Sequence, residues 1–304
     1  MKRLVKKTMT SVLLAAGMAA ASAGLPKTAS AQPIVVTPIP AQVPAKEGFA
    51  DIPDTRLWYW DTGGAGTPIV LLHPATGSGL IWSYQQPVLA KAGYRVIAYS
   101  RRGYINSATF DPAKRGNGSE DLRALADHLG LGRFHLVASA AGGSIASDFA
   151  FSYQGRLLSL TISSNSFGVR DGEIAKAAAF IRPKGWDQMP AEFRELGPSY
   201  RAANPEGTKA WMELEHKAVI GPEFRQPLKN DITQARLKEL KLPVLLIAGA
   251  ADMSTSPAMS RMLAKEIPNS TQVVAAESGH SVYWEQSEVF NRAVLDHAGK
   301  ITTR

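Results

Sequence analysis

Short apolar runs recur along the chain from Thr67 onward, and stretches with helical periodicity separate them. Each run is apolar nearly throughout, which is the pattern of strands buried on both faces of a parallel sheet. Strands are predicted at residues 68–73, 94–100, 134–139, 158–164, 243–249 and 271–276. Repeated β-α-β units predict an α/β fold with a mostly parallel central sheet and flanking helices.

The intervening stretches place apolar residues on one helical face. In residues 119–129, Leu122, Leu125 and Leu129 share such a face, and Ser119 is predicted to cap the first turn. A helix of this kind buries one side against the sheet and leaves the other in water.

Residues 170–240 break the alternation. They contain several helical patterns, repeated prolines and large aromatic residues, and no convincing strand. We predict a helical cap inserted between two strands, with residues 51–169 and 241–304 forming the core. The alternative is that these aromatic residues simply pack against the main sheet.

The first 31 residues have the pattern of a secretory signal peptide. They carry five cations and no acid, an apolar stretch from Ser11 to Ala23, and small residues at positions 29–31. The apolar stretch is shorter than the roughly 20 residues of a membrane-spanning helix, and no later segment is apolar for long enough to cross a bilayer. We therefore expect cleavage after Ala31, a periplasmic or secreted protein, and a proline-rich extended arm over residues 32–50.

The amino-acid composition excludes several classes of protein and of chemistry. With 45% hydrophobic and 20% charged residues the chain is predicted to fold, and its lack of cysteine excludes disulfides and thiolate chemistry. The net charge of +8 is concentrated in the leader, so no basic stripe for nucleic acid remains. Arg101 and Arg102 are an isolated pair, expected in a solvated loop.

Cofactor and metal signals are also weak. The glycine-rich residues 63–66 are predicted in a hairpin-like turn, without the helix and acid of a dinucleotide site, so no NAD or FAD is expected. The six histidines are scattered and form no His-x-x-x-His pair, so no metal site is predicted.

Small residues follow the strand predicted at 134–139. Ala140, Ala141, Gly142 and Gly143 form a sharp turn before a predicted helix, which is the geometry of a nucleophile elbow. Further motifs stand in chain order at residues 73–78, 100–104, 249–252 and 279–280. This is the order of the motifs in the α/β-hydrolase superfamily, which the chain resembles over residues 58–297. The resemblance is strongest to the small ester, lactone and carbon-carbon-bond hydrolases of that superfamily.

The resemblance places an alanine where the family has its nucleophile. Counted from the Leu-Val pair before it or the Gly-Gly pair after it, the nucleophile position is Ala140. A methyl group cannot attack a substrate, so two explanations stay open: a substitution that removed a serine, or a natural absence. Ser139 is a displaced candidate, although the alternation of side chains along a strand points it away from the mouth of the site.

The other two triad positions are occupied. Asp252 follows the strand at 243–249 within Gly-x-x-Asp, and His280 follows the strand at 271–276 within Ser-Gly-His-Ser. The resemblance implies that Asp252 orients the imidazole and stabilises its cation, so that His280 can accept a proton. The alternatives are a helix cap for Asp252 and a structural loop residue for His280.

The resemblance also implies an oxyanion site made of backbone N–H groups. Its donors are Ala141, after the nucleophile position, and Ala75, after an early strand. Thr76 either adds a hydroxyl or serves as a turn residue, and His73 and Arg102 are expected to be structural. Under the predicted cap, the candidate substrate-binding residues are Phe180, Trp186 and Trp211.

Three functional hypotheses follow. The first is hydrolysis of a small apolar ester, lactone or ketone, with His280 activating a water molecule in the space at Ala140. The second is a non-hydrolytic His-Asp base enzyme, namely a lyase, isomerase or cofactor-free oxygenase. The third is a catalytically silent ligand-binding protein. In each case the expected partner is a small-molecule carbonyl compound, and the sequence carries no signal for an oligomeric state.

Overall fold

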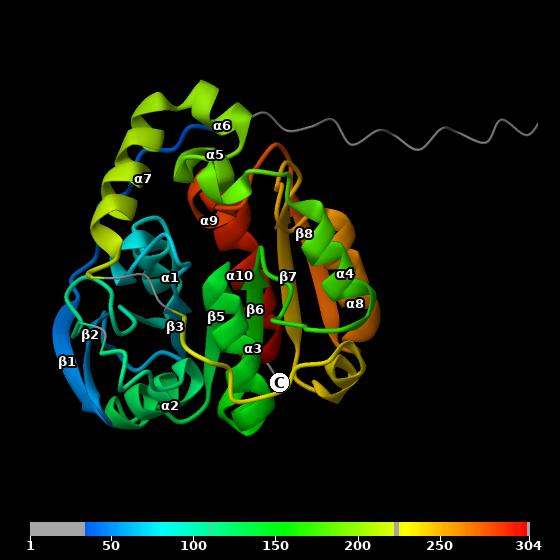
Figure 1. The fold of residues 1–304 in the computed structure, drawn as a ribbon. Coiled ribbons are helices and arrows are strands. Elements are labelled where there is room, and N and C mark those ends of the chain that lie inside the picture. Colours follow the sequence, from blue (N-terminus) through cyan, green and yellow to red (C-terminus); the bar gives the residue numbers. More distant parts are fainter. Residues whose placement is uncertain (1–33, 110, 222–224, 303–304) are drawn as a thin grey trace, which may run out of the picture. The chain divides into compact units, whose positions relative to one another are not determined.

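A central sheet of eight strands organises the fold. The strands are β1 (Lys46–Ile52), β2 (Thr55–Asp61), β3 (Pro68–Leu72), β4 (Arg95–Tyr99), β5 (Phe134–Ser139), β6 (Leu157–Ser163), β7 (Val244–Gly249) and β8 (Ser270–Ala275). Their order is β1-β2-β4-β3-β5-β6-β7-β8, antiparallel from β1 to β4 and parallel from there to β8 (Figure 1). The structure is a computed structural model that describes residues 34–109, 111–221 and 225–302.

The six predicted strands are present as β3 to β8, with ends shifted by at most one residue. Strands β1 and β2 were not predicted. Because β1 begins at Lys46, the proline-rich arm ends earlier than the predicted residue 50. Residues 34–45 contain no helix or strand, and Lys46 begins β1. The glycine-rich turn after β2 is no hairpin either, because β4 lies between β2 and β3 in the sheet.

Ten α-helices are described around and beyond the sheet. They are α1 (Gln86–Lys91), α2 (Gly118–His128), α3 (Ala141–Tyr153), α4 (Gly172–Ile181), α5 (Ala191–Glu195), α6 (Pro198–Ala203), α7 (Pro205–Ala218), α8 (Pro257–Glu266), α9 (Val282–Glu285) and α10 (Ser287–Thr302). The predicted cap of α2 was wrong. Asn117 caps this helix by accepting hydrogen bonds from the N–H groups of Ser119 and Glu120.

Two hydrophobic cores lie on the two faces of the sheet. In β3, Val70 and Leu72 face the core formed with α2, α3 and α8, whereas Ile69 and Leu71 face the core formed with α1, α9 and α10. This alternation follows from the period of two along a strand. Burial on both faces explains why β3 to β7 read as continuous apolar runs.

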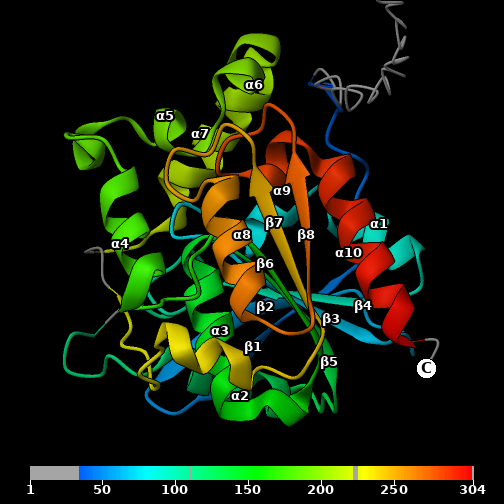
Figure 2. The same cartoon turned by 90° about the vertical axis from the view of Figure 1, so that its right-hand side faces the viewer.

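In the interval between β6 and β7, the regular structure of the described residues is helical, apart from one bridge between Tyr104 and Val219. Loops join these helices. Helix α4 packs against α8, beside the sheet. Figure 2 shows α6 and α7 at the end of the fold toward which β7 and β8 point. Helices α5 to α7 are therefore the part of this interval nearest to the carboxyl ends of the parallel strands.

Two sequence expectations concern membranes and export. Across the ranges that the structure describes, no helix combines the length and the apolar character needed to cross a membrane. The predicted signal peptide, residues 1–31, lies outside the described residues.

Candidate active site

A tight turn between β5 and α3 holds Ala140 in a strained conformation. Its φ of 47° and ψ of −123° lie in a region that residues other than glycine rarely occupy. Its N–H donates to Ser163 O at 2.9 Å, and its carbonyl accepts from Gly143 N–H at 2.8 Å. Such backbone strain costs about 1–3 kcal/mol and clusters at functional sites. The turn thus has the backbone of a nucleophile elbow, with a methyl group at its apex.

Two glycines make this turn possible. A Cβ on Gly142 would lie 2.5 Å from Leu72 O and 2.7 Å from His73 O, and one on Gly143 would lie 2.7 Å from Asn165 Cβ. The start of α3 therefore packs directly on the end of β3. This packing brings the elbow next to the loop that contains Ala75 and Thr76.

The two predicted oxyanion donors have unused N–H groups. Neither Ala75 N nor Ala141 N donates a hydrogen bond within the described chain. The hydroxyl of Thr76, on the same loop as Ala75, is buried and also has no partner among the described residues. Buried polar groups are normally paired, so these groups are available to a ligand atom.

His280 and Asp252 are brought together from different loops. Asp252 follows β7, His280 follows β8, and His280 Nδ1 lies 2.8 Å from Asp252 Oδ2. The other oxygen of Asp252 accepts from the N–H groups of Ser254 (2.7 Å) and Thr255 (2.9 Å). Because Nδ1 is engaged by the carboxylate, Nε2 is the nitrogen left for a substrate or water. In the described residues it has no hydrogen-bond partner.

The electrostatics of the pair favour the imidazolium. Burial by itself lowers the pKa of His280, but the negative charges of Asp252 and Glu195 outweigh it and raise this pKa to about 9. Burial also opposes ionisation of Asp252, yet the His280 cation and the hydrogen bonds to its carboxylate keep the pKa of Asp252 below its usual value. The two residues therefore form a buried ion pair at neutral pH.

The loop that carries His280 is tied to the helical interval between β6 and β7. The N–H groups of His280 and Ser281 both donate to Glu195 O at 2.9 Å, at the end of α5. The buried carboxylate of Glu285 accepts from Gly197 N (2.7 Å) and from Gly279 N (2.9 Å). These bonds fix the histidine loop against the segment between α5 and α6.

Several predicted residues lie elsewhere. Ser139 is fully buried and its hydroxyl has no partner in the described chain, so it is not placed to attack a ligand. Phe180 is 92% exposed on α4, beside α8, which corrects its prediction as a residue facing the site. Trp186 and Trp211 are buried, and Trp211 Nε1 donates to Tyr283 Oη at 3.4 Å. Trp211 belongs to a hydrophobic core, whereas the Arg182 guanidinium lies 5.7 Å from the centre of the Trp186 ring.

Four residues near the site were missed from the sequence. Ser254 Oγ lies 2.9 Å from His280 Nδ1, and Glu195 and Glu285 anchor the histidine loop. Arg101, expected in solvent with Arg102, is buried, as is its neighbour. Three of them stand close to predicted motifs: Ser254 two residues after Asp252, Glu285 five residues after His280, and Arg101 within residues 100–104. Glu195 had no such signal, because it contacts His280 from a segment that is distant in sequence.

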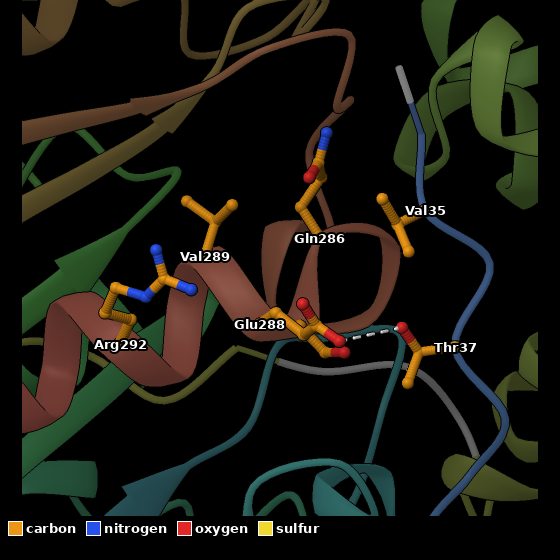
Figure 3. A pocket seen from close by; sticks show the side chains of 7 residues that line it. Val35, Thr37, Gln286, Glu288, Val289 and Arg292 are labelled. Carbon is orange, nitrogen blue, oxygen red and sulfur yellow. Dashed lines mark hydrogen bonds between the residues drawn. The ribbon is translucent and has the colours of Figure 1, made fainter. Parts of the chain in front are cut away.

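A separate pocket lies where the N-terminal segment passes α10. Val35 and Thr37 line it from one side and Glu288, Val289 and Arg292 from the other (Figure 3). It contains none of the predicted site residues, so the candidate site rests on the strand ends instead.

The chain was compared with known proteins. It is 29% identical over 243 residues to the putative carbamate hydrolase RutD of Caulobacter sp. (strain K31), covering 75% of this chain and 89% of that protein. It is 26% identical over 250 residues to the 3-oxoadipate enol-lactonase 2 of Acinetobacter baylyi, covering 79% and 92%.

A solved structure is similar in fold. The thermophilic esterase of Thermogutta terrifontis superposes with a TM-score of 0.67 at 22% identity, covering 85% of this chain and 99% of that one. The model of the alpha/beta hydrolase family matches residues 69–293. The match covers most of the chain, and the eight-stranded, mostly parallel sheet agrees with it. The chain belongs to the alpha/beta hydrolase family.

Proposed function

We propose that this protein hydrolyses a small apolar ester, lactone or ketone with a water molecule in place of a serine nucleophile. The observation that carries the proposal is the His280–Asp252 pair, 2.8 Å apart at the carboxyl edge of the sheet that also holds the elbow. The family relationship and the hydrolase names of its relatives support the reaction class.

The proposed reaction uses the groups that remain without a serine. His280 Nε2 accepts a proton from a water molecule beside the methyl group of Ala140, and the resulting hydroxide attacks the carbonyl carbon. The N–H groups of Ala75 and Ala141 stabilise the negative oxygen of the intermediate. Collapse of the intermediate expels the leaving group, which receives the proton from His280, while Asp252 stabilises the imidazolium.

The rate without a covalent nucleophile is limited. In serine hydrolases, binding and the oxyanion site alone retain roughly 10³ to 10⁴-fold acceleration over water. In addition, His280 accepts a proton only in its neutral form, and a pKa of about 9 leaves about 1% of it neutral at pH 7. The proposed activity is therefore slow and increases toward alkaline pH.

Helices α5 to α7 are proposed to cover the site as a cap. This proposal is supported by the hydrogen bonds that the N–H groups of His280 and Ser281 donate to Glu195 O at the end of α5. Phe180 is left out of the proposed substrate site because it is exposed on α4.

The test compares the protein with Ala140→Ser and with Ala140→Ser/His280→Ala on short-chain aryl esters and lactones. We expect Ala140→Ser to raise kcat by about 10² or more, because it restores covalent catalysis. We expect the double variant to return to the background. Equal rates for the protein and Ala140→Ser would contradict the proposal.

Ligand binding without turnover is a second candidate, and the methyl group at Ala140 is the observation that favours it. In that case His280→Ala leaves ligand affinity nearly unchanged and no substrate is converted. A non-hydrolytic base enzyme would instead lose its reaction with His280→Ala and gain nothing from Ala140→Ser. Adding His280→Ala in the protein with Ala140 to the test therefore separates all three functions.

Export to the periplasm or beyond remains part of the proposal, supported by the sequence pattern of residues 1–31. Mass spectrometry of the protein recovered from a periplasmic extract is expected to give an N-terminus at Gln32. A protein retained in the cytoplasm with Met1 intact would overturn this part.

A further inference from the structure

We propose that Arg101 and His73 are positioning residues that orient and polarise the peptide bond between Pro74 and Ala75, and thereby strengthen the Ala75 N–H as an oxyanion donor. The inference rests on the proposed function, in which Ala75 is such a donor. It concerns how the donor is prepared, and it assigns a role to two residues that were expected to be structural or solvated.

Three donors converge on one carbonyl oxygen. Pro74 O accepts from His73 Nδ1 at 2.7 Å, from Arg101 Nη2 at 3.1 Å and from Gly77 N at 3.3 Å. The carbonyl is therefore held from three directions. Because a peptide group is planar, fixing its oxygen also fixes the direction of the N–H of Ala75.

The partners of His73 fix its tautomer. The backbone N–H of Arg101 donates to His73 Nε2 at 3.1 Å, and Arg101 Nε donates to the same nitrogen at 3.3 Å. Nε2 is thus the acceptor and Nδ1 carries the proton donated to Pro74 O. Burial, together with the charge of Arg101, lowers the pKa of His73 well below its usual value, so the ring is neutral.

Arg101 brings an unneutralised positive charge to this carbonyl. The side chain is buried, stacks on Tyr104 at 4.6 Å, and forms no ion pair with a carboxylate in the described ranges. Arg102, next in sequence, differs because Asp121 neutralises it at 2.5 Å. A buried charge acts strongly on nearby dipoles because little water screens it.

The direction of the effect follows from the peptide geometry. No cis peptide bond occurs in the described chain, so the Pro74 carbonyl and the Ala75 N–H point in opposite directions. A cation at the oxygen draws electron density from the nitrogen and makes the N–H a stronger donor. Hydrogen bonds linked through one peptide group polarise each other in this way.

Kinetics in the Ala140→Ser protein test the consequence for catalysis. Arg101→Met keeps an apolar side chain stacked on Tyr104 but removes the charge. Arg101→Lys keeps the charge but removes the planar set of N–H donors of the guanidinium. We expect Arg101→Met to lower kcat about tenfold with KM unchanged, less than the 10² to 10³ lost with a whole donor. Arg101→Lys is expected to recover part of this loss. The pH at half-maximal kcat is expected to stay in place, because His280 is not altered.

The matched control is Arg95→Met. Arg95 is the first residue of β4, at the end of the sheet opposite to the carboxyl ends of the parallel strands, and it pairs with Asp61. Its loss is therefore expected to affect stability and to leave kcat unchanged. Equal changes in kcat for Arg101→Met and Arg95→Met would overturn the inference. A rise in KM with unchanged kcat would do so too, because it indicates a role in ground-state binding.

A second readout does not need activity. In the protein with Ala140, labelling proline with ¹³C at the carbonyl and alanine with ¹⁵N isolates the Pro-Ala peptides by NMR. Arg101→Lys and Arg101→Met are expected to shift the Ala75 amide ¹⁵N and ¹H signals to lower frequency, further for Met. An unchanged Ala75 signal would overturn the inference even if Ala140→Ser is active. An inactive Ala140→Ser with a shifted signal would instead count against the proposed function alone.

Discussion

The carboxylate of Glu285 accepts a hydrogen bond from Gly279 N–H at 2.9 Å, one residue before His280. It also accepts from Ser281 N at 3.2 Å, one residue after the histidine, and from Gly197 N at 2.7 Å. One buried side chain therefore holds both sides of the proposed base and ties them to the segment before α6.

This arrangement makes stability depend on pH. Burial raises the pKa of Glu285 to about 7 despite its three N–H donors, whereas in the unfolded chain the value is about 4.5. Between these values the folded state binds more protons, so stability falls as pH rises from about 4.5 to 7 and stays lower above 7. The contribution is about 3 kcal/mol.

Glu285→Gln is expected to remove this slope. Relative to the parent, the variant gains up to about 3 kcal/mol between pH 5 and pH 8 in urea unfolding. Glu288→Gln, at an exposed position three residues on, is the matched control and leaves the slope unchanged. The opposite result, in which the parent becomes more stable than Glu285→Gln as pH rises, would contradict this prediction. It would mean that the three N–H donors lower the pKa of Glu285 by more than burial raises it.

The rate of the Ala140→Ser protein is expected to rise with pH through the pKa of His280. Because that pKa is raised to about 9 by Asp252 and Glu195, the midpoint of kcat lies well above 6.5. Glu195→Gln removes one of the two negative charges and is expected to move the midpoint down. Glu213→Gln, an exposed change on α7, leaves it in place. A midpoint near 6.5 in all three proteins would contradict this electrostatic account.

Asp252→Asn is expected to reduce kcat of the Ala140→Ser protein by roughly 10⁴-fold, the effect of the corresponding change in serine proteases. It is also expected to lower the pKa of His280, which ¹H–¹⁵N NMR of the imidazole measures directly. In the parent the raised pKa of His280 stabilises the fold below about pH 6.5 and this contribution is lost as pH rises through 9. A His280 pKa that does not fall in Asp252→Asn would show that Asp252 does not hold the cation.

Gly142→Ala is expected to destabilise the protein by about 1–3 kcal/mol, because its Cβ meets the backbone oxygens of Leu72 and His73. Gly132→Ala is the matched control, since nothing lies within 4 Å of an added Cβ there. Thermal unfolding of both variants measures the difference. Equal Tm values would show that the elbow can move away from β3.

The sequence by itself determined the parallel part of the sheet and the order of its motifs. Strands β3 to β7 are readable because each is buried on two faces and so is mostly apolar. In β8, which is largely half-buried, the short apolar run of Val273 to Ala275 was the signal. Residues 46–52 were not readable as a strand, because β1 is mostly exposed or half-buried and contains three charged residues. The sharp turn at Ala140 was also predictable, because a run of small residues between a buried strand and a helix is the pattern of a nucleophile elbow.

The tertiary structure decided which polar residues share an environment. The distance between His280 and Asp252, the ties from Glu195 and Glu285, and the burial of Arg101 all join segments that are distant in sequence. A charged pair such as Arg101 and Arg102 is usually solvated, and only the packing around β3 and β4 shows that both are buried. Local pattern fixes elements, because it reflects local burial, whereas a site depends on how the loops at the strand ends pack together.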